Sequence, residues 1–229
     1  MSAENPDFLR DTRTAYDTIA YDFDKQFPAE GLAGLVLERA LFGAFAEWVG
    51  ANRASGRSAA PVADLGSGPG HITARLDALG LPVFGVDVSP RMVELARRAY
   101  PELRFHVGSM TSLDLPASTL GGIVALYSII HVPDDQLPAT FAEFERVLVP
   151  GGYVLLAFQA GREEGNTEHL HLDERFGHEI SLDYYWRDPD TVADLLKQAG
   201  LRPHTQVVRE PQEGEVRPRA FLVARKDTA

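Results

Sequence analysis

The sequence predicts an α/β protein with a parallel, doubly wound sheet. Between about residues 62 and 158, short apolar runs of strand length alternate with amphipathic stretches of helical length. The segment from Pro61 to Thr73 adds a strand, a glycine-rich turn and the start of a helix in direct succession. Repeated units of this kind need crossover connections, which place the strands parallel in one sheet and the helices on its two faces.

Two amphipathic helices are expected before the sheet, at Thr14–Phe27 and Leu32–Val49, with a polar, glycine-bearing loop over 50–61. The alternating region then predicts strands at 62–66, 82–87, 103–107, 122–127 and 152–158, and helices at 70–79, 90–99 and 135–148. Ser89 and Pro90 are typical of an N-cap followed by the first helical residue. The run Pro150-Gly151-Gly152 ends the last of these helices.

The segment from 160 to 190 interrupts the alternation, because it is polar and rich in histidine and aromatic residues. We interpret it as an insertion over the site. A helix at 191–198 and two strands at 204–208 and 220–225 complete the chain, and the short loop between these strands permits an antiparallel pair. One core can reach this size, so a single domain over 1–229 is expected.

Composition narrows the class of protein. With 45 % hydrophobic and 24 % charged residues the chain is typical of a soluble globular protein, and we expect neither a membrane span nor a signal peptide. The 22 basic and 33 acidic residues give a net charge of −11, which argues against a nucleic-acid partner. The lack of cysteine excludes disulfides and thiolate metal sites and is compatible with the cytoplasm.

The glycine turn predicts a ligand site. Gly66, Gly68 and Gly70 let the backbone turn sharply at the end of a buried strand and deliver the ligand to a helix N-terminus, which favours an anionic group. Asp87 ends the next strand at the same edge of the sheet, where its carboxylate can accept both hydroxyls of a ribose. The alternative role for Asp87 is a helix cap, for which Ser89 is better placed.

Two details separate the possible ribose cofactors. The third glycine, Gly70, comes one position too early for the Gly-x-Gly-x-x-Gly fingerprint of a dinucleotide, and Asp64 adds an acid that would repel a pyrophosphate. An acid beside an anion-binding turn suits a ligand with both an ammonium and a carboxylate group. The amino-acid part of methionine has both, and S-adenosylmethionine adds the ribose.

At this point the sequence resembles the class I S-adenosylmethionine-dependent methyltransferases, of the type that acts on small molecules. The resemblance runs from about Tyr16 to Val223, and its motifs are residues 62–70, 85–92, 108–110, 123–131 and 146–152. It implies a Rossmann-like sheet of seven strands, mostly parallel with an antiparallel last strand. It also implies an N-terminal helical lid over 1–50, a cofactor-binding core over 61–158, a substrate-cap insertion over 159–190 and a C-terminal unit over 191–229.

The resemblance also assigns roles to residues of the core. Asp64 resembles the acid that orients the methionine amino group, Asp87 the ribose acceptor, and Gly66, Ser67 and Gly68 the turn around the methionine moiety. Val88 and Met92 correspond to the adenine contacts, although a methionine at helical spacing also suits plain core. The remaining positions act through their backbone, with Ser109 and Met110 at the adenine edge and Leu126 and Tyr127 at the amino group.

Tyr16 and Tyr21 lie in the part that is similar to the lid, and either hydroxyl could reach the cofactor carboxylate, with Tyr21 favoured. The alternative is that both tyrosines anchor a surface helix. His131 follows the fourth strand and is our candidate general base, since imidazole is partly neutral at physiological pH. Its alternative role is to cap a turn.

The insertion holds further candidates. His169, His171 and Asp173, with His178 nearby, could form a metal site, but the absence of thiolates favours solvated or substrate-contacting side chains. The aromatic residues Tyr184, Tyr185 and Trp186 either line the acceptor pocket or pack the insertion onto the sheet.

The function expected from all these features is transfer of a methyl group from S-adenosylmethionine to an oxygen or nitrogen of a small molecule, with S-adenosylhomocysteine as second product and without metal. The alternatives are a nicotinamide-dependent oxidoreductase and a non-catalytic protein that binds S-adenosylmethionine.

Overall fold

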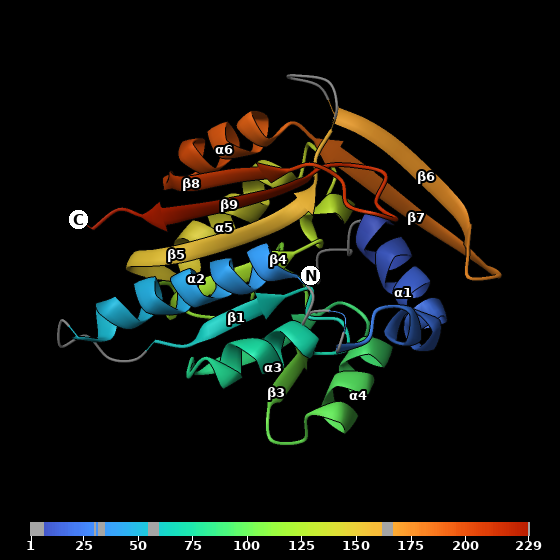
Figure 1. The fold of residues 1–229 in the computed structure, drawn as a ribbon, viewed down its shortest axis with the longest axis horizontal. Coiled ribbons are helices and arrows are strands. Elements are labelled where there is room, and N and C mark those ends of the chain that lie inside the picture. Colours follow the sequence, from blue (N-terminus) through green and yellow to red (C-terminus); the bar gives the residue numbers. More distant parts are fainter. Residues whose placement is uncertain (1–6, 30, 32–34, 55–59, 162–166, 229) are drawn as a thin grey trace, which may run out of the picture.

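A seven-stranded sheet forms the centre of the computed structural model, which describes residues 7–29, 31, 35–54, 60–161 and 167–228. The strand order is β3-β2-β1-β4-β5-β9-β8 (Figure 1). Neighbouring strands from β3 to β5 are parallel, and β9 is antiparallel to both β5 and β8. The predicted fold class, including the antiparallel last strand, is therefore confirmed.

The predicted elements occur in the predicted order, and η2, β6 and β7 are additional. The helices are α1 (Asp7–Gln26), α2 (Val36–Ala54), α3 (His71–Ala78), α4 (Pro90–Ala99), η2 (Ile129–His131), α5 (Leu137–Val147) and α6 (Pro189–Gln198). The strands are β1 (Val62–Leu65), β2 (Val83–Asp87), β3 (Arg104–Val107), β4 (Leu120–Leu126), β5 (Leu148–Gln159), β6 (Thr167–Arg175), β7 (His178–Arg187), β8 (Leu201–Arg209) and β9 (Arg219–Lys226).

Helices cover both faces of the sheet, because successive side chains of a buried strand point to opposite faces. In β5, Leu155 packs with α2 and α3, whereas Val154 and Leu156 pack with α5 and α6. Helix α1 and the β6–β7 hairpin stand beyond the carboxyl ends of the parallel strands (Figure 1). This arrangement closes off the sheet edge at which the glycine turn lies.

Two predictions of secondary structure need correction. Helix α1 begins at Asp7 rather than Thr14, and α2 continues to Ala54, into the segment predicted as loop. The start of the second predicted helix (32–34) and the middle of that loop (55–59) lie outside the described residues. Ser89 caps α4 as predicted, since its hydroxyl oxygen accepts the backbone N–H of Met92.

The insertion contains a regular hairpin that the sequence did not indicate. Strands β6 and β7 pair antiparallel through a two-residue turn at Phe176 and Gly177, whose φ angles are 55° and 80°. Such a turn needs two left-handed residues, and Phe-Gly is a weaker signal for it than Asn-Gly or Asp-Gly. Residues 162–166 of the insertion are not among those described. No helix in the described parts of the chain is long and apolar enough to cross a membrane.

Candidate active site

A cavity of about 530 Å³ opens at the carboxyl ends of β1, β2 and β4. The glycine turn and the ends of these strands form its floor, α1 and η2 form one wall, and α2 with the loop before β9 forms the other. Twelve of the predicted site residues line it: Tyr16, Gly66, Ser67, Gly68, Asp87, Val88, Met92, Ser109, Met110, Leu126, Tyr127 and His131.

The glycine turn is shaped by packing as much as by chain flexibility. Gly66 and Gly68 have φ angles of 75° and 50°, in the region that L side chains rarely adopt. A Cβ on Gly66 would overlap the side chain of Ser128, whereas a Cβ on Gly68 would meet no protein atom within 4 Å. The backbone at Gly68 is therefore open to a ligand, while Gly66 is needed for the turn itself.

Asp87 links the turn to the next helix. One carboxylate oxygen accepts the N–H of Gly68 at 2.8 Å, and the other accepts the N–H of Ser89 at 2.8 Å. Burial raises the pKa of Asp87 to about 6. The carboxyl group lines the cavity and has lone pairs left for further donors. Beside it, the buried hydroxyl of Ser67 has no partner among the described residues.

Asp64 lies below the turn and does not line the cavity. Its carboxylate accepts the hydroxyl of Thr73 at 2.6 Å and also hydrogen-bonds the backbone of Thr73, in the first turn of α3. Gly70 has no side chain to cap this helix, so Asp64 does so from the neighbouring strand. Burial raises the pKa of Asp64 to about 7. In this structure the carboxylate orients α3 and the turn rather than facing the cavity.

Tyr127 follows β4 in a strained conformation, with a φ angle of 52°. Its N–H donates to the carbonyl of Ala157 at 2.6 Å, and burial raises the pKa of its phenol to about 12. The guanidinium of Arg219 lies 5.8 Å from the centre of its ring. The positive φ angle turns the ring toward this wall of the cavity, where sequence reasoning expected only a backbone role.

The two tyrosines of α1 lie in different environments. Tyr16 lines the cavity, and its hydroxyl is 2.8 Å from Nε2 of His131. Tyr21 is 54 % exposed and contacts the guanidinium of Arg91 outside the cavity. A separation of five residues turns the two side chains to different faces of a helix. The preference for Tyr21 as a cofactor contact therefore has no support in the geometry.

Both ring nitrogens of His131 are hydrogen-bonded. Its Nδ1 is 2.8 Å from the carbonyl oxygen of Asp183, which can only accept, so Nδ1 carries the proton. In the neutral ring Nε2 is then an acceptor, and the hydroxyl of Tyr16 donates to it. Burial lowers the pKa of His131 to about 4. The ring is neutral at physiological pH, in one tautomer.

The position of His131 depends on Arg187, which sequence reasoning missed. This guanidinium is 2 % exposed and donates to the carbonyls of Ile129 and Val132, on either side of His131, at 3.2 and 2.5 Å. It also pairs with Asp134 at 2.6 Å. A lone arginine at the end of a predicted insertion gives no signal in the sequence, because its partners lie more than 50 residues away.

The histidines of the insertion do not form a metal site in the described residues, where no cluster of three ligating side chains occurs. His169 and His171 instead share one carboxylate oxygen of Asp183, at 2.8 and 2.9 Å. His178 reaches Asp22 of α1 at 2.9 Å. Asp173 takes no part in these contacts.

The three aromatic residues of β7 are divided between the two expected roles. Tyr184 lines the cavity and hydrogen-bonds Tyr16, and its oxygen accepts from Arg175. Tyr185 stacks on His169 outside the cavity, and Trp186 packs under the guanidinium of Arg217. The alternation of β7 turns Tyr185 to the opposite face from Tyr184. Trp186 shares the face of Tyr184, with ring centroids 6.2 Å apart, but does not line the cavity.

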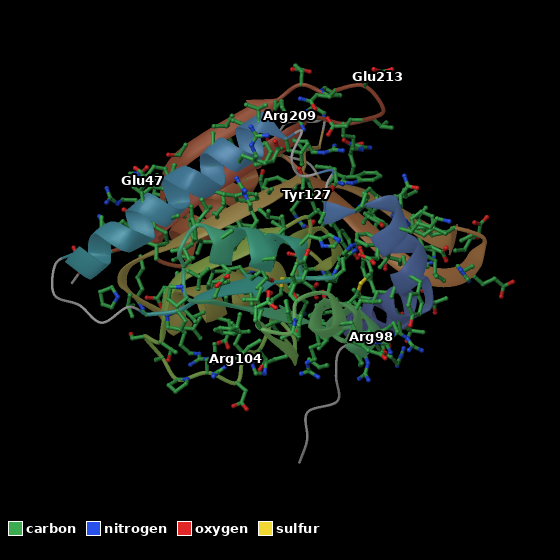
Figure 2. All side chains as sticks on the ribbon, turned by 60° about the horizontal axis from the view of Figure 1, so that its bottom comes forward. Glu47, Arg98, Arg104, Tyr127, Arg209 and Glu213 are labelled. Atoms are coloured by element: carbon green, nitrogen blue, oxygen red, sulfur yellow. The ribbon has the colours of Figure 1, made fainter. Side chains whose placement is uncertain are left out.

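The far wall of the cavity is charged, which the sequence did not reveal. Glu38 of α2 and Glu215 both contact the guanidinium of Arg209, which lies beside the first turn of α2 (Figure 2). Glu38, Glu215 and Arg219 line the cavity together with Gln159, whose Oε1 is buried without a partner in the described part of the chain. These residues come from four separate segments.

Comparison with known proteins agrees with this geometry. Residues 62–152 match the sequence model of the methyltransferase domain family. This match, together with relatives that are named methyltransferases, supports the resemblance to the class I S-adenosylmethionine-dependent methyltransferases. The matched segment runs from the first residue of β1, through the glycine turn and Asp87, to the glycines of β5. The family resemblance noted in the sequence is thereby confirmed.

Among curated relatives, the chain is 32 % identical over 92 residues to demethylmenaquinone methyltransferase of Chlorobaculum parvum, which is 40 % of this chain and 37 % of that protein. It is 25 % identical over 161 residues to an uncharacterized methyltransferase of Geobacillus, covering 66 % of this chain and 73 % of that one. The chain spans less than half the length of the first relatives, 37 to 45 %.

Solved structures share the fold over nearly the whole chain. A 1,6-didemethyltoxoflavin-N1-methyltransferase of Burkholderia thailandensis, with its substrate and S-adenosylhomocysteine bound, has a TM-score of 0.66 at 21 % identity and covers 99 % of this chain and 92 % of its own. A magnesium protoporphyrin IX methyltransferase of Synechocystis with bound SAM has a TM-score of 0.67 at 15 % identity, covering 99 % and 100 %. A [4+2]-cyclase also matches, with a TM-score of 0.58 at 18 % identity over 74 % of this chain and 75 % of its own.

Proposed function

We propose that this protein binds S-adenosylmethionine in the cavity and transfers its methyl group to an oxygen or nitrogen of a small molecule. The observation that carries the proposal is the open glycine turn at Gly68, placed directly beside the carboxylate of Asp87 on the cavity floor. A turn that admits backbone contact and an acid that accepts two hydroxyls suit an amino acid joined to a ribose.

The residues of the floor fit this cofactor. The backbone of the turn, open at Gly68, is available to the methionine moiety, and Asp87 to the ribose. Val88, Met92 and Met110 offer apolar surface for an adenine. The backbones of Ser109, Leu126 and Tyr127 keep the roles that the family resemblance implies. Asp64 would act on the amino group only through the turn that it supports.

The bound cofactor would supply a methyl group that is already activated on a sulfonium. The chain then has three tasks, namely to align the acceptor, to exclude water, and to accept a proton where the acceptor loses one. Helix α1 and the hairpin contribute lining residues of the cavity, and His131 lines it from η2. The neutral ring of His131 has the protonation state of a base.

A small-molecule acceptor is supported by the cavity and by the relatives. The cavity of about 530 Å³ is lined largely by apolar and aromatic side chains with a few charged groups among them, which is typical of sites for small ligands. Relatives and structural neighbours are named for a menaquinone precursor, a toxoflavin precursor and a porphyrin. The cyclase among the neighbours means that the fold alone does not decide the reaction.

Titration calorimetry tests the cofactor. We expect binding of S-adenosylmethionine and S-adenosylhomocysteine, and none of NADH. Binding of NADH alone would support the oxidoreductase alternative and end the proposal.

A mass-spectrometric screen with S-adenosylmethionine and a metabolite mixture then tests the reaction, with a product heavier by one methylene unit as the expected result. Cofactor binding without any such product would favour a non-catalytic binding protein. The proposal also includes a single domain, which is divided into lid, core, cap and C-terminal unit. It further includes action in the cytoplasm without a nucleic-acid or membrane partner.

A further inference from the structure

His131 has no free nitrogen for a substrate. The ring is only 6 % exposed, its Nδ1–H donates to the carbonyl of Asp183, and its Nε2 accepts the hydroxyl of Tyr16. Aromatic edges of Tyr16 and Tyr184 pack on the ring at centroid distances of 5.3 and 4.6 Å. A proton from the cavity can therefore reach Nε2 only through the hydroxyl of Tyr16, as long as this arrangement is kept.

Both residues of this pair line the cavity, but only Tyr16 has lone pairs left for a further partner. A phenol oxygen carries one proton and two lone pairs, and here the proton is directed to His131. The lone pairs are left for a donor in the cavity, and the hydroxyl of Tyr184 lies within hydrogen-bonding reach of the same oxygen. Arg175 in turn donates to the oxygen of Tyr184, so a cation backs the far end of the chain of hydrogen bonds.

We propose that Tyr16 takes the proton from the methyl acceptor while passing its own proton to His131. This step rests on the proposed function. The acceptor's X–H bond breaks as its X–CH3 bond forms with the methyl that the sulfonium supplies. The acceptor's proton goes to the oxygen of Tyr16, and the proton of Tyr16 goes to Nε2 of His131. The products are a methylated acceptor, a neutral thioether and an imidazolium, so the total charge is unchanged.

Because the total charge of the site is the same before and after methyl transfer, a buried histidine can serve as the final proton acceptor. Burial lowers the pKa of His131, and a sulfonium bound in the cavity would lower it further. Loss of that positive charge on methyl transfer would favour the imidazolium that His131 forms. The charged groups that act on the pair are Asp87 of β2 and Arg175 and Asp183 of the hairpin.

The same geometry indicates the class of acceptor. Proton transfer is most efficient between groups of similar pKa, and the direct partner of the acceptor is a phenol. Burial and the neighbouring Tyr184 raise the pKa of Tyr16 well above its usual value, and Arg175 acts in the opposite direction, so the phenol gives up its own proton to His131 as it takes the proton of the acceptor. The relay therefore suits a phenol, an enol or a heteroaromatic N–H, whereas an aliphatic ammonium group would compete with the sulfonium for the site.

Nuclear magnetic resonance of ¹⁵N-labelled histidine tests the pair without any acceptor. In the free protein, Nδ1 of His131 should be protonated and Nε2 should not. The pKa of His131 should be higher in the complex with S-adenosylhomocysteine than in that with S-adenosylmethionine. An equal pKa in the two complexes, or the opposite tautomer, would overturn the relay.

Kinetics with an acceptor found in the screen test the route of the proton. Y16F and H131Q should each reduce kcat by about 100-fold, within the range that acid–base catalysis contributes. Glutamine at 131 can still accept the hydrogen bond of Tyr16 but cannot take its proton. The double variant should be no slower than either single variant, because both interrupt one route, and the solvent isotope effect on kcat should disappear in all three.

The matched control is Y21F, the same change on the exposed face of α1, which should leave kcat and cofactor affinity unchanged. A Y16F variant that binds cofactor and methylates at the normal rate, or effects of Y16F and H131Q that multiply, would refute the relay and leave the proposed function standing. Failure of the unmodified protein to bind S-adenosylmethionine would instead refute the proposed function.

Discussion

The two halves of the cavity differ in how the chain builds them. In the floor, the glycine turn and Asp87 come from two consecutive strand–helix units, and the hydrogen bond between Gly68 and Asp87 spans only 19 positions. The acceptor side joins Tyr16 to His131 across 115 positions, and His131 to Asp183 across 52. Local motifs thus form the cofactor half, whereas only tertiary packing forms the acceptor half.

This difference indicates where each half is vulnerable. The floor depends on backbone conformation, so its sensitive positions are glycines and the acids that hydrogen-bond the turn. The acceptor side depends on a few long side chains that connect distant segments. Substitutions in the two halves should therefore affect different measurements, as the following predictions specify.

The largest expected effect separates two glycines of the floor. G66A should destabilise the protein by about 4 kcal/mol, because its Cβ overlaps Ser128 and its φ angle is unfavourable for alanine. G68A meets no protein atom and should cost about 1 kcal/mol for the φ angle alone. Urea unfolding measures both, and equal losses would contradict the distinction. G68A should still weaken cofactor binding, since its Cβ points into open space on the cavity floor.

On the acceptor side, Arg187 is the position at which a substitution should destabilise the protein most, as Gly66 is on the floor. R187M removes the donors of two carbonyls that flank His131 and should destabilise the protein by about 3 kcal/mol. D134A removes the partner that is itself 56 % exposed and should cost less than about 1 kcal/mol. Denaturant unfolding with the two variants checks this order. If D134A lowered the free energy of unfolding as much as R187M, the ion pair rather than the hydrogen bonds to the carbonyls would be the main stabilising contact of Arg187.

A substitution of Asp87 tests whether the floor of the cavity binds S-adenosylmethionine. D87A should weaken binding of S-adenosylmethionine about 100-fold, as expected for two hydrogen bonds to a charged group. Calorimetry measures the affinity, and the thermal unfolding curve shows that the variant is folded. In the unmodified protein the affinity should rise with pH around 6, because burial raises the pKa of Asp87 to about 6 and the ribose contact uses the carboxylate. An affinity independent of pH would remove Asp87 from the site.

The smallest effect concerns Asp64 and the pH dependence of stability. Burial raises the folded pKa of Asp64 to about 7, well above its usual value, so the folded state binds the proton more tightly than the unfolded chain and loses this advantage as pH rises toward 7. D64N keeps an acceptor for Thr73 without titrating. Relative to the unmodified protein, D64N should gain about 2 kcal/mol between about pH 5 and pH 7. Parallel stability curves for the two proteins would contradict the raised pKa.

Much of the fold and of the cofactor half was predictable from sequence. The alternation of strands and helices, the cap at Ser89 and the antiparallel last strand are all found in the structure. These features depend on residues close together in the chain, and their signals are periodicity, glycine and proline. The hairpin at Phe176–Gly177 and the extension of α2 past Val49 were not predicted, since tertiary contacts outweigh weak local preferences there.

The sequence by itself determined that a glycine turn and Asp87 meet at the carboxyl edge of a parallel sheet, because chirality and strand order leave few other arrangements. Only the tertiary structure decided that Tyr16 rather than Tyr21 enters the cavity, that Asp64 supports the turn from below, and that both nitrogens of His131 are occupied. The physical reason is that orientation and burial of these side chains depend on how α1, η2 and the hairpin pack together.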